Sequence, residues 1–343
     1  MYNFGTLPHY IISTKSTQNY LRMNRCFLML LFATVISFSH GQNCLPTGIT
    51  FLTQAEVDAF PSNYPNCTEI DGTVTIGNSA CLNNMPTDIN NLDSLTQLTN
   101  IHASLRISFN PDLVDLSGLE GIVSIDGDLR ITCNDNLINF SGLNNLVSIG
   151  GQVRIGSSSS YYDNDILENL VGLTNLINPN IYINNSPSFK NFTGLNSANS
   201  LQELWVLNCD SLENFIGLEN ITLISGLFEV SGIDNDFDFT GLQNLTTIEG
   251  DFILGSSNNQ TVNGLSSLSE IQGQMEIYLC ESLMDINAFG SHTSVQAINI
   301  YFTPLASLSG LHNVSNFSIP SSNVNNLILF GNTNLNDISA LSS

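Results

Sequence analysis

Apolar residues recur along this chain with a period of about 24 residues. One unit begins at Gly118-Leu119 and the next at Gly142-Leu143. The opening residue is leucine in every unit but one, and successive units open 22 to 30 residues apart, at Leu95, Leu119, Leu143, Leu173, Leu195, Leu218, Leu242, Leu265, Phe289, Leu311 and Leu341. A repeat of this length is typical of stacked units, none of which can bury its apolar face alone. The sequence therefore predicts a solenoid whose function lies on ladders of side chains.

Each unit contains a short segment in which apolar and polar residues alternate. In one unit Leu129 and Ile131 alternate with Asp128, Arg130 and Thr132, the period-two pattern of a strand with one buried face. Apolar residues then return at intervals of three without the i+4 partners of a helix, which indicates turns and very short strands. The pattern predicts eleven strands, with buried pairs at Val74/Ile76, Leu105/Ile107, Leu129/Ile131, Val153/Ile155, Ile181/Ile183, Leu204/Val206, Phe228/Val230, Phe252/Leu254, Met275/Ile277, Ile298/Ile300 and Leu327/Leu329.

A ladder of small polar residues follows these strands. Five residues after the first buried strand position, the units carry Asn110, Asn134, Cys209, Cys280 and Asn332. A buried Asn at a turn satisfies backbone groups that the bend leaves unpaired, and a small Cys fits the same place. We therefore predict that Cys209 and Cys280 are buried thiols. They lie three coils apart, about 14 Å, and a disulfide needs Cα atoms within about 7 Å.

Two longer gaps between units mark insertions, within Gly156–Asp165 and Ser318–Asn323. Insertions into a solenoid become loops on one edge, which is often the binding edge. Neutral drift in a tolerant turn explains them at least as well.

The first 41 residues differ in composition from the rest of the chain. An apolar run, Cys26–Phe38, is followed by small residues that end at Gly41. This predicts a secretory signal peptide over residues 23–41, with Met23 as the true start and residues 1–22 as an over-extended gene start. A membrane anchor is the alternative, but 13 apolar residues are too few to span a bilayer.

Export would place the remaining six cysteines in an oxidising compartment. Cys44 and Cys67 flank Thr53-Gln54-Ala55-Glu56, a capping-box start for a short helix that we expect to end before Pro61. A bridge between these two cysteines would staple a cap over the first coil, and Cys81 is an alternative partner for Cys67. Another residue, Cys133, sits one place off the ladder, and we expect it to be free.

The repeated pattern Ile-x-Gly-x-Leu-x-Ile-x-x-Asn resembles that of the receptor L-domain family. It occurs at Ile125–Ile131 and similarly at Ile149–Ile155, and the segment Ile49–Gly72 resembles the N-terminal cap of secreted bacterial members. The resemblance covers about residues 44–343. It implies a leucine-rich β-solenoid that serves as a binding or adhesion module, although fold alone does not fix function. Such bacterial proteins often end in a sorting domain, and since this chain ends in an uncapped coil at Ser343, we expect a truncated array.

Charge narrows the classes of partner. The chain has 7 basic and 30 acidic residues, a formal net charge of −23 at pH 7. Lys15, Arg22 and Arg25 precede residue 42, where there is no acid, so the remainder carries 4 basic and 30 acidic residues, a net charge of −26. Binding to phosphate backbones needs a basic footprint. We therefore predict that nucleic acid is not a partner.

The scarce basic residues gather in one outward column. The residue between the two buried strand positions is Arg106, Arg130 and Arg154 in three consecutive units, then Tyr182 and Trp205. Like charges about 4.8 Å apart repel by roughly 0.9 kcal/mol even in water, so the cluster favours an anionic partner. Arg suits carboxylate, sulfate or phosphate, and Tyr and Trp suit sugar or protein contacts.

Contacts within the chain itself are an alternative explanation for this column. The arginines could pair with Asp126, Asp128 and other surface acids, while the aromatic residues fill a partly exposed sheet. Further along the sheet, a second outward column brings Tyr278, Tyr301 and Phe330 onto neighbouring coils and predicts a weaker aromatic patch.

Calcium and catalysis are the other chemistries considered. The segments Asp234–Asp238 and Asp163–Asp165 alternate acidic residues but lack the glycine and distal Glu of a calcium loop, so we interpret them as solvated turns. Glu229 and Glu276 stand two coils apart, about 9.6 Å, within the range of an inverting glycosidase. Ile253 separates them, however, and no aromatic or basic cleft surrounds them. We predict no metal, no cofactor and no enzyme activity.

These observations predict an all-β protein, a right-handed parallel β-solenoid of about eleven coils over residues 73–343, with a small disulfide-bonded helical cap over residues 42–72. The predicted function is non-catalytic recognition of an anionic glycan or an acidic protein segment, secreted or at the cell surface, in a chain that does not span the membrane after signal cleavage. A structural spacer within a larger surface protein is the alternative, and a β-helical carbohydrate-active enzyme ranks below it.

Overall fold

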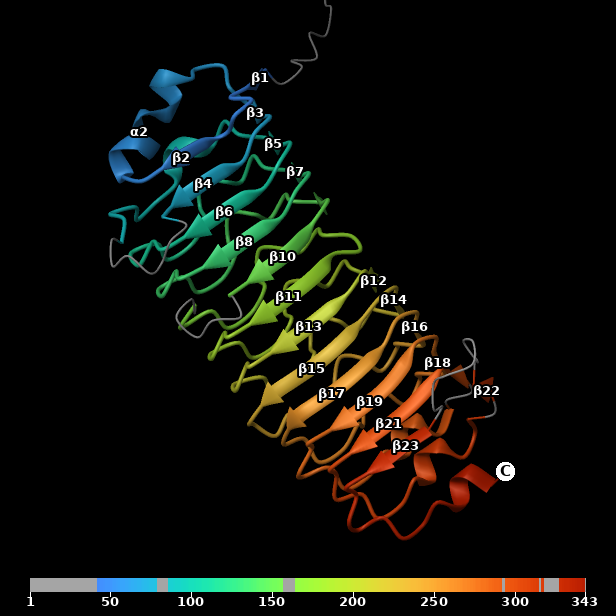
Figure 1. Ribbon diagram of the computed structural model, residues 1–343. Coiled ribbons are helices and arrows are strands. Elements are labelled where there is room, and N and C mark those ends of the chain that lie inside the picture. The colour runs from blue at the N-terminus through green and yellow to red at the C-terminus, as the bar shows by residue number, and fades with distance from the viewer. Residues whose placement is uncertain are drawn as a thin grey trace, which may run out of the picture. The chain divides into compact units, whose positions relative to one another are not determined.

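The computed structural model describes residues 42–78, 86–156, 164–291, 294–314, 316–317 and 327–342. The predicted start and signal peptide, residues 1–22 and 23–41, lie outside this part of the chain, and so does Cys81. Within it the chain forms a parallel β-solenoid of about ten turns with one short α-helix near its N-terminal end (Figure 1).

The main sheet has twelve parallel strands, each paired with the corresponding strand of the next coil. All eleven predicted strands are present, and a twelfth, β2, comes from the cap and pairs with β4. The strands are β2 (Ile49–Phe51), β4 (Val74–Gly77), β6 (Leu105–Ser108), β8 (Leu129–Thr132), β10 (Gln152–Ile155), β11 (Asn180–Asn184), β13 (Leu204–Leu207), β15 (Phe228–Ile233), β17 (Phe252–Ser257), β19 (Gln274–Tyr278), β21 (Ala297–Tyr301) and β23 (Leu327–Phe330).

A second wall of two-residue strands lies ahead of the main strands in the chain, as the three-residue apolar spacing predicts. It forms two sheets. The first contains β1 (Asn43–Cys44), β3 (Glu69–Ile70), β5 (Asn100–Ile101), β7 (Ser124–Ile125) and β9 (Ser148–Ile149). The second contains β12 (Ser200–Leu201), β14 (Leu223–Ile224), β16 (Thr247–Ile248), β18 (Glu270–Ile271), β20 (Ser294–Val295) and β22 (Asn316–Phe317). Short 3-10 turns, η2 (Asp93–Leu95), η3 (Asn287–Ser291), η4 (Ser309–Leu311) and η5 (Ser339–Ser342), complete some coils.

The second wall is interrupted where one coil is two residues short. Val153 follows Leu146 by seven positions, whereas Ile181 follows Leu176 by five. The missing pair corresponds to β9, and Pro179 in this coil has no N–H to donate. The second wall therefore splits between β9 and β12, while the main sheet runs on through β11.

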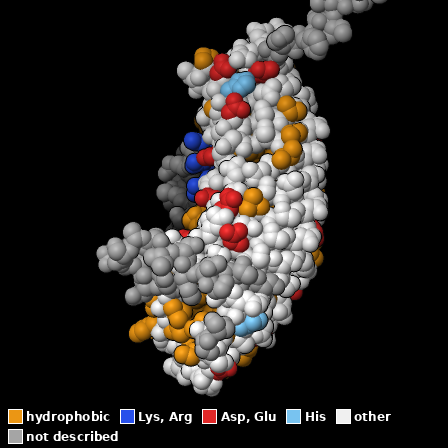
Figure 2. Space-filling model, turned by 90° about the vertical axis from the view of Figure 1, so that its right-hand side faces the viewer, with side chains coloured by type: hydrophobic (Ala, Val, Ile, Leu, Met, Phe, Trp, Pro, Cys, Tyr) orange, Lys and Arg blue, Asp and Glu red, His pale blue; other side chains and the backbone are white. Residues whose placement is uncertain are grey.

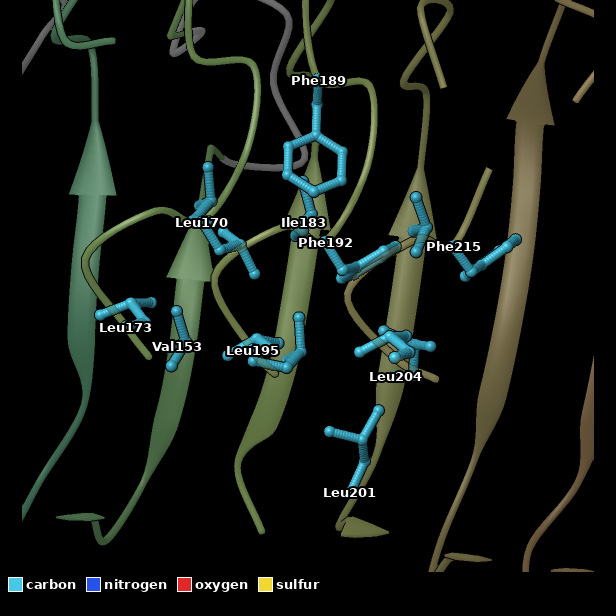
Figure 3. Packing of buried hydrophobic residues seen from close by; sticks show 14 of the residues in the cluster. Val153, Leu170, Leu173, Ile183, Phe189, Phe192, Leu195, Leu201, Leu204 and Phe215 are labelled. Carbon is cyan, nitrogen blue, oxygen red and sulfur yellow. The ribbon is translucent and has the colours of Figure 1, made fainter. Parts of the chain in front are cut away.

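The core is a column of side chains between the walls. Both predicted apolar positions of β4 through β21 are buried, whereas Leu327 and Leu329 of β23 are half-buried. From Phe189 onward the core is rich in phenylalanine (Figure 3). The Phe215 ring stacks between two others, with centroids 5.5 Å from Phe192 and 5.3 Å from Phe239.

The polar ladder forms as predicted in the N-terminal coils. Asn110 Nδ2 donates to Ile76 O and Asn134 Oδ1, and Asn134 Nδ2 donates to Ile107 O at 2.8 Å. The ladder continues at Asn164, whose Oδ1 accepts from Asn134 N at 3.1 Å. This corrects the assignment of Asn164 to a solvated turn, because the insertion before it disguises its place in the repeat.

In later coils the ladder position carries sulfur or hydroxyl groups, as at Cys209 and Ser257, before an amide returns at Asn332. Cys209 and Cys280 are buried free thiols, as predicted. Burial raises the pKa of Cys209 to about 12, despite the backbone groups near its sulfur, so both the position and the chemistry of this thiol make it unreactive.

The cap combines a disulfide with a capped helix. Cys44 and Cys67 are bonded, with Cα atoms 5.6 Å apart. The helix α2 (Gln54–Asn63) begins with a capping box, in which Thr53 accepts from Glu56 N and the Glu56 carboxylate accepts from Thr53 N. Its predicted end before Pro61 is wrong. The proline lies inside the helix, which ends when Tyr64 N donates to Phe60 O at 2.8 Å.

The prediction that Cys133 is free is also wrong. Cys133 is disulfide-bonded, and its partner lies outside the described residues. It is buried at a corner of the coil with a φ of 56°. Asn134 occupies the ladder position of this coil, so the argument for a free thiol in the ladder does not extend to Cys133.

Candidate ligand-binding face

The five predicted site residues lie side by side on the outward face of the main sheet. Register pairs Arg106 with Arg130, Arg130 with Arg154, Arg154 with Tyr182, and Tyr182 with Trp205. All five side chains are half-buried. We call these five residues the arginine–aromatic column. Basic side chains gather along one edge of the solenoid in Figure 2, with acidic side chains beside them.

Arg130 is neutralised by an acid on its own strand. Its Nε and Nη2 donate to Asp128 Oδ2 at 3.0 and 2.7 Å. Burial alone would raise the pKa of Asp128, but the Gln152 amide N–H, the Arg130 guanidinium and the charge of Arg154 together bring the pKa below its usual value. Asp128 therefore stays ionised and holds Arg130 close to the sheet.

Arg154 has no carboxylate partner in the described part of the chain. Its Nη1 donates to Gln152 Oε1 at 3.2 Å. Its guanidinium carbon lies 4.4 Å from the Tyr182 ring centroid, within the range of a cation–π contact. The Tyr182 and Trp205 rings are 6.1 Å apart and tilted by 48°. The indole Nε1 donates to Glu203 Oε2 at 3.3 Å, so cation and rings form a continuous platform.

Arg106 is the least satisfied of the three arginines. Its Nε is buried and has no hydrogen-bond acceptor within the described residues. A buried donor without a partner costs about 1–3 kcal/mol. Such a group is therefore a candidate for contact with something outside the chain.

The alternative interpretation, that surface acids pair with the arginines, holds for only one of the three. Arg130 pairs with Asp128, but Asp126 pairs with His102 instead, its Oδ2 lying 3.0 Å from His102 Nδ1. Elsewhere on the chain, Lys190 pairs with Glu168 at 2.7 Å. Across the described residues the column therefore holds the cations that have no carboxylate within ion-pair distance, Arg106 and Arg154.

Sequence reasoning named Asp128 as one candidate ion-pair partner but missed the supporting column to which it belongs, one place before the first buried position of each strand. Asp128, Gln152 and Glu203 stand there, and each accepts from the column residue two places later on its own strand. Period-two alternation puts residues i and i+2 on the same face. The polar residues at i−1 were therefore a readable signal.

The other end of the same face is acidic. Register places Glu229, Ile253 and Glu276 next to one another on β15, β17 and β19. Burial, followed by the charges of Asp251 and Glu229, raises the pKa of the Glu276 carboxyl. The aromatic residues Tyr278, Tyr301 and Phe330 are in register as predicted.

The acidic turns are spread over separate partners. Asp236 accepts from Gln260 Nε2 at 3.0 Å, and Asp238 accepts from Thr240 N at 2.8 Å. Asp163 lies outside the described residues. Within those residues, no three His, Cys, Asp or Glu side chains come together in a group that could hold a metal ion.

The geometry of this face can be compared with known proteins. No protein-family model, curated protein or solved structure matches this chain. The resemblance to receptor L domains therefore stays a prediction from the residues. In the described part of the chain, no helix is both long and apolar enough to cross a bilayer.

Proposed function

We propose that this chain is a non-catalytic recognition module, secreted or at the cell surface, that binds an acidic glycan or an acidic protein segment through the arginine–aromatic column. The signal peptide predicted over residues 23–41 and the Cys44–Cys67 bridge support export. The resemblance to receptor L domains gives the same expectation of a binding role.

One observation carries the proposal. In a chain with a net charge of −26 after residue 41, three of the four basic side chains stand in consecutive register on one flat face. Like charges on adjacent strands cost stability, and only Arg130 has a compensating carboxylate among the described residues. An anionic ligand would relieve this repulsion and give Arg106 and Arg154 their missing partners.

The aromatic end of the column defines the second half of the site. Tyr182 and Trp205 are fixed by hydrogen bonds from Asn184 Nδ2 to the Tyr182 hydroxyl, at 2.8 Å, and from the indole to Glu203. Rings held in one orientation lose little entropy on binding. They are suited to pack against a sugar ring or an apolar side chain of an otherwise acidic ligand.

The decisive experiment compares two variants of equal charge. The first, Arg106→Gln with Arg130→Gln and Arg154→Gln, lowers the net charge by three on the face. The control, Gln243→Glu with Asn144→Asp and Asn196→Asp, lowers it by three at turns off this face. At those turns the side chain accepts from a glycine N–H, a task that Glu120 and Glu219 carry out elsewhere.

Binding of residues 42–343 to polygalacturonate, heparin and polyglutamate is measured by titration calorimetry, with neutral dextran as a reference. We expect wild type and control to bind at least one polyanion, and the arginine variant to bind it at least about 100-fold more weakly, since three charge-assisted contacts are lost. Equal binding by the two variants would refute the proposal. Absence of binding by wild type would favour a structural spacer.

A further inference from the structure

The outward face of the main sheet carries basic residues on one side of its centre and acidic residues on the other. Numbered along the twelve strands, the middle falls between β11 and β13. On one side the column carries Arg106, Arg130 and Arg154, and on the other side it carries Glu229 and Glu276. Tyr182 and Trp205 occupy the two central strands.

We propose that a second copy of this chain docks on this face, antiparallel to the first, about a two-fold axis that runs along the strands between β11 and β13. The inference rests on the proposed function of the arginine–aromatic column and names one acidic partner for it, the acidic end of the same face in another copy. In Figure 1 the axis passes between the labels β11 and β13.

Such an axis pairs each strand with the strand at the same distance on the other side of the centre. Arg154 on β10 then faces Glu229 on β15 of the other copy, and Arg106 on β6 faces Glu276 on β19. Because the interface is isologous, each pair occurs twice, so four opposite-charge pairs form from two kinds of contact. Tyr182 faces Trp205 across the axis, which places a four-ring aromatic cluster at the centre.

The remaining arginine also fits this arrangement. Arg130 on β8 faces Ile253 on β17, and Asp251 immediately precedes that strand. The guanidinium would lie between Asp128 of its own strand, which it already contacts, and Asp251 of the other copy. One cation would thus separate two carboxylates that otherwise repel.

The area of the face is sufficient for a specific dimer. Eight central strands at about 4.8 Å spacing, each presenting about five residues at 3.3 Å, give about 1,300 Å² for the two copies together. This clears the roughly 1,000 Å² expected of a biological interface and lies at the lower end of stable ones. We expect a dimer that dissociates on dilution.

The test uses charge-swapped variants of residues 42–343 in analytical ultracentrifugation. The acid-reversed variant carries Glu229→Arg and Glu276→Arg, and the arginine-reversed variant carries Arg106→Glu and Arg154→Glu. The control, Glu249→Arg with Glu281→Arg, makes the same charge change as the acid-reversed variant at exposed residues outside the main-sheet strands. Salt is kept near physiological strength so that the general repulsion is screened beyond about 8 Å.

Wild type and control should show a concentration-dependent monomer–dimer equilibrium. Each swapped variant alone should have a dimer dissociation constant raised at least about tenfold, because like charges then face each other. An equimolar mixture of the two swapped variants should recover dimer, since arginine then faces glutamate again. Recovery on mixing also shows that both variants are folded.

Three results would overturn the inference: wild type that stays monomeric at high micromolar concentration, an acid-reversed variant that dimerises as the control does, or a mixture that recovers no dimer. Polygalacturonate binding separates this failure from that of the proposed function. The acid-reversed variant keeps the arginine–aromatic column and should bind the polyanion at least as tightly as wild type. A monomer that binds the polyanion refutes only the dimer, and a dimer that binds none refutes only polyanion recognition.

Discussion

The N-terminal coils, residues 42–156, and the C-terminal coils, residues 180–330, share one register but use different side chains at equivalent positions. At the ladder, the N-terminal coils use the amides of Asn110 and Asn134, and later coils use thiols such as Cys209. In the core, Leu116 occupies the position that Phe215 occupies later. Outside, arginine gives way to glutamate. Each coil contacts only its neighbours. The same backbone can therefore carry one set of side chains in the N-terminal coils and another set in the C-terminal coils.

The largest expected effect is on the aromatic core. Phe215→Ala should lower the free energy of unfolding by about 3–5 kcal/mol. The ring touches Phe192, Phe228, Phe237 and Phe239, and aromatic pairs add about 0.5–1.5 kcal/mol each beyond burial. The matched change Leu116→Ala should cost at least about 1 kcal/mol less. Urea unfolding, followed by fluorescence of the single tryptophan and by hydrogen exchange, measures both. Equal losses would mean that the two cores pack equivalently.

The ladder offers the next contrast. Asn134→Ala should cost about 2–3 kcal/mol, because the buried Asn110 N–H and Ile107 carbonyl lose their partners. Cys209→Ala at the equivalent place removes only a weak donor and about one atom of packing, so about 1 kcal/mol is expected. Chemical denaturation of both variants tests the difference. A Cys209→Ala loss as large as that of Asn134→Ala would show that the thiol is equally important for the turn.

The smallest expected effect is the dependence of stability on pH, and it involves only the N-terminal coils. His102 lies between Asp126 and Glu69, at 3.0 and 3.2 Å, and these hydrogen bonds raise its pKa from 6.5. A raised pKa means that the stabilisation is complete below pH 6.5 and is lost as pH rises through the folded value. The group is about one-third exposed, so less than about 1 kcal/mol is expected.

Thermal unfolding of wild type between pH 5 and about pH 9, beside His102→Gln, provides the measurement, with the window set by the ordinary histidine pKa. The unfolding temperature of the variant should change less with pH across this window than that of wild type. Hydrogen exchange of the C-terminal coils should be the same in both proteins. A variant as pH-sensitive as wild type would assign the titration to another group.

Much of this fold could be predicted from the sequence, because the alternation of apolar and polar residues marks strands and the period of about 24 residues marks coils. The eleven strands and the arginine–aromatic column followed from period-two burial. What escaped prediction depended on tertiary context. Pro61 is tolerated within the helix, and an insertion hid the place of Asn164 in the repeat. The disulfide of Cys133 also escaped prediction, because the period does not show which cysteines meet.

The two-residue deletion before Ile181 has a mechanical consequence. Between β9 and β12 the second wall is reduced to isolated backbone hydrogen bonds, Ile177 N to Val147 O and Gln202 N to Pro179 O. A force that pulls the two ends of the stack apart is therefore shared here by the main sheet and the remaining turns, through bonds such as Phe140 N to Val171 O and Leu170 N to Thr193 O. The coil at Pro179 has the weakest second wall of the stack, so we expect the coils to separate along that wall first.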